Sequence, residues 1–318
     1  MLQAVTHFVG IDVSKRTCDV AGLDATAVHK ILNTADGHQQ LITRLPAPGI
    51  CLIVMESTGG YEAPLALALS SAGHLVAVVN PKQVKHYIRS RNVLAKTDRI
   101  DARLLAEFAR ERTPVPKAYC ADQEHLQALI VRRRQVVEHR TSERNRKQQA
   151  QFADVAKSVQ QSIDAATKEI RRLEKEILKL VRADDDWRER YERAQTVPGV
   201  GKAVAAALVG ELPELGNISR EQVASLAGVA PVNRDSGEFR GHRFVQGGRQ
   251  GVRNLLYMAA LSAIKCNPVI RSYYVRLKQQ GKASKVALTA CMRKLLVILN
   301  TMFRTRTNWS EHRRAQPV

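Results

Sequence analysis

The chain has 318 residues, 44% of them hydrophobic and 25% charged, with a formal net charge of +20 and a pI near 10.1. This length suffices for more than one hydrophobic core, and no apolar run long enough to cross a membrane is evident, which argues against a membrane protein. The positive excess favours a nucleic-acid partner over a merely solubilising basic face, and it is strongest in residues 197–318, with 19 Lys or Arg and 6 Asp or Glu.

The N-terminal third predicts an α/β domain. Short apolar runs predict three strands in an antiparallel meander, two helices and two further buried strands, at residues 7–13, 17–23, 27–33, 35–45, 50–55, 61–72 and 74–79. The resulting order of elements is typical of a ribonuclease-H-like domain. The same order of elements occurs at the start of the actin-like sugar kinases. Such an enzyme would bind a nucleotide and would need no basic surface.

Four acidic residues lie at positions where a sheet of this kind commonly forms functional sites. Asp12 and Glu56 end the strands predicted over 7–13 and 50–55, and open α/β sheets place sites at the carboxyl ends of strands. Asp98 and Asp101 are three residues apart at the start of a predicted helix, on one helical face. Taken alone, the Asp98 pair is better explained by a capped helix with a solvated acidic end.

The four acids together indicate a metal site. Like charges repel unless cations lie between them, and hard oxygen ligands suit magnesium (Mg²⁺) or manganese (Mn²⁺). Two such ions would clamp the attacking and leaving oxygens of a phosphoryl transfer. The basic segment 82–94, with Lys82, Lys85 and Arg89, could line the path of a phosphate backbone, or form an ordinary solvated helix face.

Residues 122–193 contain almost no glycine or proline and predict a long helical region. A heptad register with Ile163, Ile170 and Ile177 at one seam position predicts a coiled coil that joins protomers. The alternatives are a helix packed within its own domain and an intrachain hairpin with residues 122–150. Asp184, Asp185 and Asp186 predict a helix break followed by a new cap.

The C-terminal third opens with Pro198-Gly199-Val200-Gly201-Lys202 ahead of a helix over 203–212, and a short helix follows over 221–228. This is the hairpin of a helix-hairpin-helix, which holds a phosphate through Gly199, Gly201 and Lys202, or else a tight turn between helices. The polar loop 227–243 contains Ser236 with Arg234, Arg240 and Arg243 nearby. The residues alone favour a turn-forming serine over a nucleophile. Helices over 249–263, 268–280 and 284–303 close the chain.

Taken together, these segments resemble the DEDD-type insertion-sequence transposases, the IS110 family that includes the Piv DNA invertases. The resemblance rests on motifs that occur in order along nearly the whole chain: Gly10-Ile11-Asp12-Val13-Ser14-Lys15, Glu56-Ser57-Thr58-Gly59, Asn80-Pro81, Lys96-Thr97-Asp98-Arg99-Ile100-Asp101, Pro198-Gly199-Val200-Gly201, Ala227-Gly228-Val229-Ala230-Pro231 and Asp235-Ser236-Gly237.

The resemblance implies three domains: a RuvC-like (RNase H-fold) metal-dependent catalytic domain over 1–118, a helical coiled-coil linker over 119–195, and a mainly α transposase domain over 196–318 with a helix-hairpin-helix and a serine loop. It implies two metal ions on Asp12, Glu56, Asp98 and Asp101, and a covalent link between Ser236 and DNA. The implied partners are donor and target DNA, a structured bridge RNA from the same element, and further copies of the chain in a dimer or tetramer.

The absence of a recognisable secretory signal and the five scattered cysteines favour reduced thiols in a bacterial cytoplasm, close to the nucleoid. The leading hypothesis is therefore a DNA recombinase that uses a serine nucleophile. The main alternative is a RuvC-like two-metal nuclease that resolves DNA junctions by hydrolysis. A non-catalytic nucleic-acid scaffold would not need four intact acids, and a sugar-kinase-like enzyme would leave the net charge unexplained.

Overall fold

The computed structural model describes residues 5–24, 27–91, 97–232, 235–236, 239–240 and 243–315, with the backbone alone at 235–236, 239–240 and 313–315. The chain divides into two compact units, Met1–Glu124 and His125–Val318. The helices of residues 125–195 belong to the second unit and share its hydrophobic core, although we predicted them as a separate linker.

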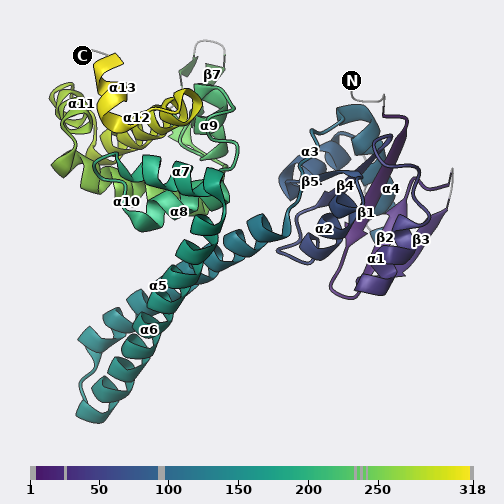
Figure 1. Cartoon of the computed structure of the whole chain (residues 1–318), viewed down its shortest axis with the longest axis horizontal. Coiled ribbons are helices and arrows are strands. Elements are labelled where there is room, and N and C mark those ends of the chain that lie inside the picture. The colour runs from purple at the N-terminus through teal and green to yellow at the C-terminus, as the bar shows by residue number, and fades with distance from the viewer. Residues whose placement is uncertain are drawn as a thin grey trace. The chain divides into compact units, whose positions relative to one another are not determined.

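A five-stranded mixed sheet forms the centre of the first unit (Figure 1). Its strands are β1 (His7–Val13), β2 (Thr17–Ala21), β3 (Val28–Leu32), β4 (Cys51–Glu56) and β5 (Leu75–Val79). They lie in the order β3-β2-β1-β4-β5, with an antiparallel β1–β2–β3 meander, and with β4 parallel to β1 and to β5. The predicted meander and crossover strands are confirmed.

Helices cover both faces of this sheet: α1 (Ala35–Ile42), α2 (Ala63–Ser71), α3 (Pro81–Ser90) and α4 (Asp98–Arg112). On one face, Leu65 of α2 packs in a core with Ile11 and Ile53. On the other face, Leu105 of α4 packs in a second core with Val54. Because side chains alternate along a strand, the even-numbered residues of β1 and β4 face α4.

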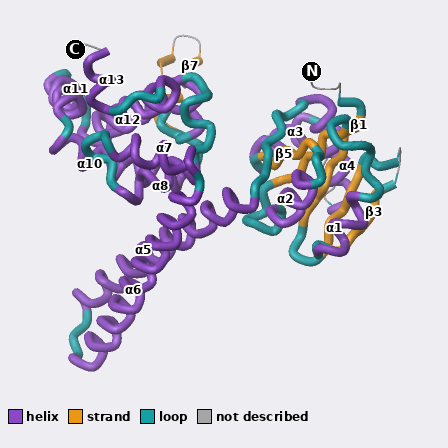
Figure 2. Tube along the Cα trace, in the orientation of Figure 1, coloured by secondary structure: helices purple, strands orange, loops and turns teal. Residues whose placement is uncertain are grey.

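The second unit is mainly helical (Figure 2). Its helices are α5 (Ala121–Gln149, which begins in the first unit), α6 (Ala153–Ala183), α7 (Asp185–Gln195), α8 (Lys202–Glu211), α9 (Arg220–Leu226), α10 (Gln250–Cys266), α11 (Pro268–Gln279), α12 (Ser284–Thr305) and α13 (Trp309–Ala315). The side chain of Asp184 accepts a hydrogen bond from the amide of Trp187 at 2.8 Å, which confirms the predicted break and cap.

The predicted loop between α9 and α10 contains four two-residue strands: β6 (Pro231–Val232), β7 (Asp235–Ser236), β8 (Phe239–Arg240) and β9 (Phe244–Val245). β6 pairs with β9, and β7 pairs with β8. Aromatic and β-branched residues favour extended pairing, which explains how a polar, glycine-rich segment still forms these short ladders.

α5 and α6 form a long helical hairpin, and the predicted heptad seam is covered within it. Ile170 and Leu173 of α6 are 4% and 1% exposed, and they pack in a small core with Val136 of α5. The structure therefore gives these positions the intrachain partner that we had kept as an alternative. At the start of α6, Phe152 and Val155 remain 69% and 46% exposed.

α12 is the one described helix long and apolar enough to cross a membrane by length and composition. However, 61% of its most apolar window is buried inside the protein, where Leu295, Leu299 and Met302 are fully covered. We therefore interpret α12 as a core helix of the second unit. All five cysteines of the chain are free thiols, as predicted.

Candidate active site

Asp12 and Glu56 stand at the carboxyl ends of two adjacent parallel strands. β1 and β4 pair with Ile11 opposite Met55, so Asp12 and Glu56 follow at the same level. Val54 packs against α4, and Glu56, two residues further along the same strand, is on the same face of the sheet. Both acidic residues are partly exposed.

α4 lies directly against β1 because residue 10 is glycine. A Cβ atom at Gly10 would lie 2.3 Å from the carbonyl oxygen of Ala102 and 2.2 Å from the backbone nitrogen of Ala106. Asp12 follows Gly10 by two residues and therefore faces the same helix. The absence of a side chain at Gly10 thus sets how closely the acid-bearing helix approaches the acid-bearing strand.

The first turn of α4 lies at the same end of β1 as Asp12. Arg110, near the end of α4, lines one cavity together with His7 at the start of β1, so the helix runs antiparallel to the strand. The first turn carries Asp98, which is exposed, and Asp101, which is partly buried. Thr97 caps this turn, since its hydroxyl accepts a hydrogen bond from the amide of Ile100 at 3.3 Å.

Gly10→Ala should destabilise the first unit, because the added methyl group meets helix backbone that cannot move independently. Overpacking of this kind costs about 1–3 kcal/mol, which would lower the melting temperature by several degrees. Ser71→Ala, at an exposed position of α2 in the same unit, is the control. Equal melting temperatures for the two variants, measured by circular dichroism, would contradict this packing.

Asp19 is an acidic residue near the site that sequence reasoning missed. It lies opposite Asp12 across the β1–β2 pair, is 3% exposed, and forms an ion pair with Lys30 at 3.5 Å. Burial, followed by the charges of Asp12 and Asp19, raises the pKa of Cys18 to about 12. The sequence predicted a strand over 17–23, but it gave no reason to expect that a charged side chain within it would be buried.

Glu62 is a second missed carboxylate, and it organises the loop after Glu56. Its two oxygens accept hydrogen bonds from the Ser57 hydroxyl at 3.1 Å, the Thr58 amide at 3.0 Å, the Thr58 hydroxyl at 2.8 Å and the Gly60 amide at 2.9 Å. Burial acts to raise the pKa of Glu62, but hydrogen bonds from its own backbone amide, from Thr58 and from Gly60 outweigh it and hold the pKa below its usual value.

Glu62→Gln should therefore change how stability depends on pH. A lowered carboxyl pKa contributes stability that is complete above the usual value of 4.5 and is lost as the pH falls through the lower folded value. The wild-type melting temperature should fall more steeply than that of the variant as the pH is lowered from about 6 to about 3. Parallel curves for the two proteins would show that the Glu62 charge contributes nothing to the fold.

The structure brings the backbones of the four predicted acids to one end and one face of the sheet, but it does not gather their side chains. Within the described residues, no group of three or more His, Cys, Asp or Glu side chains is arranged to hold a metal ion. Asp12, Glu56 and Asp101 each interact with a neighbouring group instead. The donor set is nevertheless composed only of carboxylates, the chemistry that magnesium and manganese prefer.

α3 presents the predicted basic face close to this sheet. Lys82, Lys85 and Arg89 are exposed, whereas Val84 and Tyr87 on the other side of the helix are buried. The neighbouring Arg91 is engaged by carboxylates of α4, at 3.0 Å from Glu107. The three exposed cations match the predicted phosphate-facing surface in position, and their role remains a prediction.

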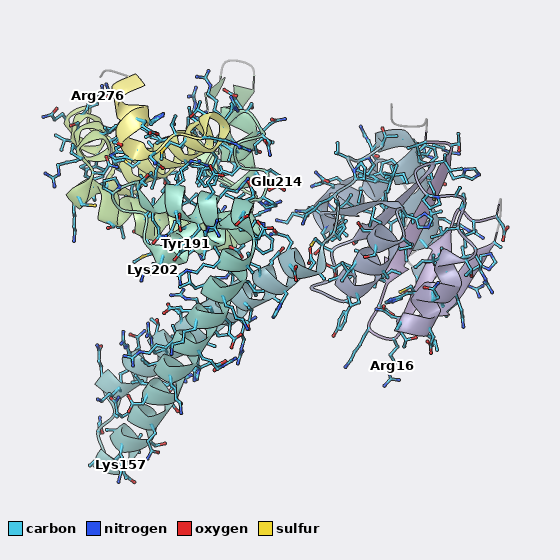
Figure 3. The ribbon with its side chains drawn as sticks, in the orientation of Figure 1. Arg16, Lys157, Tyr191, Lys202, Glu214 and Arg276 are labelled. Carbon is cyan, nitrogen blue, oxygen red and sulfur yellow. The ribbon has the colours of Figure 1, made fainter. Side chains whose placement is uncertain are left out.

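The Pro-Gly-x-Gly turn joins α7 to α8 in the second unit. Gly199 has a φ of +99°, and a Cβ atom there would lie 2.7 Å from the backbone of Ala263 in α10. Gly199 is thus required by packing. Gly201 and Lys202 are exposed at the start of α8, where Figure 3 shows the Lys202 side chain. The predicted phosphate contact is available to these two residues.

Ser236 lies in a hairpin that projects between β6 and β9. The backbone pairs Asp235 with Arg240 and Ser236 with Phe239. Arg234 lies outside the described residues, as do the side chains of Ser236 and Arg240. Arg243 is exposed and lines a cavity of about 910 Å³ beside the hairpin.

Two protein-family models match this chain, one in its N-terminal half and the other in its C-terminal half. Residues 9–151 match the DEDD transposase family model named for IS110, and residues 191–275 match the model described as "Transposase IS116/IS110/IS902 family". Both models describe transposases, so the protein is an enzyme of DNA transposition or recombination. The chain belongs to the IS110/IS116/IS902 family, as the resemblance predicted. The DEDD class implies dependence on a divalent metal in general.

Two relatives match this chain over nearly its whole length, and a third matches a shorter part. The pilin gene-inverting protein of Moraxella bovis is 28% identical over 312 residues, which are 93% of this chain and 95% of that protein. The protein of the same name from Moraxella lacunata gives the same identity and coverage. An uncharacterized 44.8 kDa protein of insertion element IS116 from Streptomyces clavuligerus is 35% identical over 136 residues, 41% of this chain and 32% of that protein.

Proposed function

We propose that this transposase cuts and rejoins DNA at a composite site, where Asp12, Glu56, Asp98 and Asp101 hold two magnesium or manganese ions and Ser236 is the nucleophile. One observation carries the acidic half: the carboxyl ends of β1 and β4 and the first turn of α4 meet on one face of the sheet. This arrangement also supports a RuvC-like assignment for the first unit.

Divalent ions bound by the four acids would polarise the scissile phosphate and stabilise the charge that develops on it. Asp98 and Asp101 lie in the first turn of α4, at the positive end of the helix dipole. Thr97 holds the backbone of that turn, and Glu62 holds the loop that follows Glu56. The four side chains would close together only once cations offset their mutual repulsion.

The Ser236 hydroxyl performs the exchange. Its oxygen forms a bond to phosphorus while a bond from phosphorus to a DNA oxygen breaks, and the serine proton leaves with the departing DNA hydroxyl. Attack by a hydroxyl of the new DNA partner reverses these changes and frees the serine. The number of phosphoester bonds stays constant, so rejoining needs no external energy source.

The partners follow from charge and from the family. DNA is the substrate of the reaction, and we propose that a structured RNA from the same element selects it. The excess of Lys and Arg in residues 197–318 supports contact with two nucleic acids. We also infer a dimer or tetramer, because Phe152 and Val155 leave an apolar surface uncovered at the start of α6.

Binding to duplex DNA should weaken steeply with salt, because each neutralised phosphate releases counterions. Replacing Lys82, Lys85 and Arg89 with Ala should reduce the slope of log affinity against log salt by about 0.9 per phosphate contact. The control replaces Lys157, Lys168 and Lys179 of α6, which are also exposed. Filter binding measures both slopes, and an equal reduction in the control would exclude α3 from the DNA path.

A junction-resolving nuclease is the second candidate, since the acidic site alone suffices for hydrolysis. The two functions differ in their products. Incubation with end-labelled donor and target DNA should give rejoined strands and, after denaturation, labelled protein. Ser236→Ala should give neither, whereas Ser272→Ala, in an exposed part of α11, should behave as wild type. Cleaved DNA without labelled protein would establish the nuclease instead.

A further inference from the structure

A groove in the second unit borders the Ser236 hairpin, and neither the family matches nor the catalytic proposal uses it. Its volume is about 910 Å³, near the upper end of pockets that hold whole small molecules. Its lining residues come mainly from α12 and the β6–β9 pair, with others from α9 and α11. Figure 1 shows α9 and α12, which pack against each other, in this part of the unit.

The groove carries strong positive charge. Among its described lining residues the basic ones are Arg220, Arg243, Lys282, Lys285, Arg293 and Lys294. The one acidic residue among them, Glu221, is already paired with Arg220 at 2.5 Å. Lys285 and Arg293 are two helical turns apart, so they follow one face of α12. A ligand of this groove is therefore an anion.

The groove is also apolar between its cations, and this excludes a purely ionic ligand. Its apolar lining residues include Val286, Ala290 and Val297 of α12, and Pro231 and Val245 of the β6–β9 pair. Val286 and Val245 are 56% and 38% exposed. Duplex DNA presents phosphates and keeps its bases stacked inside, whereas an unpaired strand offers both phosphates and apolar base faces.

Two cations of this region are held in place rather than left mobile. The Nζ atom of Lys294 lies 4.6 Å from the centre of the Tyr273 ring, and the guanidinium carbon of Arg276 lies 5.2 Å from the same ring. Tyr273 and Lys294 both line the groove. Cation–π contacts already restrict these charged side chains. They therefore lose little further conformational entropy when they bind a phosphate.

The groove leads to the proposed nucleophile. Pro231 of β6 lines the groove, and Ser236 follows it by five residues. Five residues of chain reach at most about 18 Å. A strand that occupies the groove therefore runs within a few nucleotides of the serine.

We propose that this groove binds an unpaired DNA strand next to the phosphate that Ser236 attacks, with bases against the α12 valines and phosphates on Lys285 and Arg293. The proposal rests on Ser236 as the nucleophile, which is why the strand is DNA and not the guide RNA.

The test uses the full-length Ser236→Ala chain, so that binding is measured without chemistry. Fluorescence anisotropy compares a labelled single-stranded DNA, the same strand with abasic sites, the duplex, and RNA of the same sequence. Val286→Ser should weaken binding of the intact single strand about three- to five-fold and leave the abasic strand unchanged. Val275→Ser, 46% exposed on α11 and outside the groove, is the matched control and should change neither.

A second variant tests the charges. Lys285→Ala with Arg293→Ala should make the slope of log affinity against log salt shallower by about 1.4 for single-stranded DNA. Lys179→Ala with Lys265→Ala, two exposed residues elsewhere in the unit, is the control. The proposal is overturned if the groove variants match their controls, or if they affect RNA or duplex more than single-stranded DNA. Because adduct formation is assayed separately, the groove can fail while the serine mechanism stands.

Discussion

Asp12→Asn is expected to reduce strand exchange by about a thousand-fold or more while leaving the fold intact. The substitution keeps the size of the side chain but removes a charged metal ligand, and metal-based charge stabilisation contributes several kcal/mol to a phosphoryl transfer. Each 1.36 kcal/mol corresponds to about ten-fold in rate. Asp101→Asn should have an effect of the same order, measured as rejoined product formed per unit time in magnesium.

The control for these variants is Asp36→Asn, an exposed carboxylate in the first turn of α1, which covers the other face of the sheet. It should retain wild-type activity. Metal binding gives a second readout, because wild-type protein should bind manganese by titration and Asp12→Asn should bind it more weakly. Exchange in magnesium that survives either site variant would remove the four-acid assignment.

The second large effect concerns how the two halves of the site are shared. Ser236 and the acids belong to different compact units, since the chain divides at Glu124 and His125. If the units of two protomers combine at the DNA, a mixture of Ser236→Ala and Asp98→Asn chains should regain exchange, although each variant alone is inactive. If dimers assemble at random, about half of them contain both variants, and each of these has one competent site of two. The expected recovery is therefore up to about a quarter of the wild-type rate.

Mixing denatured and refolded chains, or co-expressing them, ensures that subunits exchange before the assay. A Ser236→Ala and Ser236→Ala mixture is the matched control and should stay inactive. An inactive mixture of the two different variants, with subunit exchange demonstrated, would show that one chain supplies both halves of the site.

Much of the fold could be predicted because its signals are local. The strand that carries Asp12 near its end, the cap at Thr97 and the new helix at Asp184 each depend on residues within a few positions of one another. The direction of α4 and its contact with Gly10 could not be predicted in the same way. They arise from tertiary packing between residues about 90 positions apart in the chain, where no periodicity applies.

The heptad pattern of α6 shows a different limit of sequence reasoning. Ile170 and Leu173 have the spacing of a coiled-coil seam, but that spacing requires only an apolar partner and does not say which chain supplies it. α5 supplies it here, through Val136. The short strands around Ser236 were missed for another reason. A strand of two residues is too short to show the alternation of apolar and polar residues that identifies a strand in a sequence.

Within the candidate site, the four acids were predicted from strand ends and helix spacing, whereas Asp19 and Glu62 were not considered. Both are almost buried, at 3% and 9% exposure. Buried carboxylates need partners, and those partners, Lys30 for Asp19 and the Thr58–Gly60 loop for Glu62, become evident only in three dimensions.

The most direct test of the central claim is to trap the covalent protein–DNA adduct, digest it with protease and nuclease, and locate the modified residue by mass spectrometry. The proposed mechanism predicts a nucleotide joined through a phosphoester to the peptide that contains Ser236, formed only with a divalent metal and absent from Asp98→Asn. An adduct on another residue, or an adduct that persists in Ser236→Ala, would contradict it.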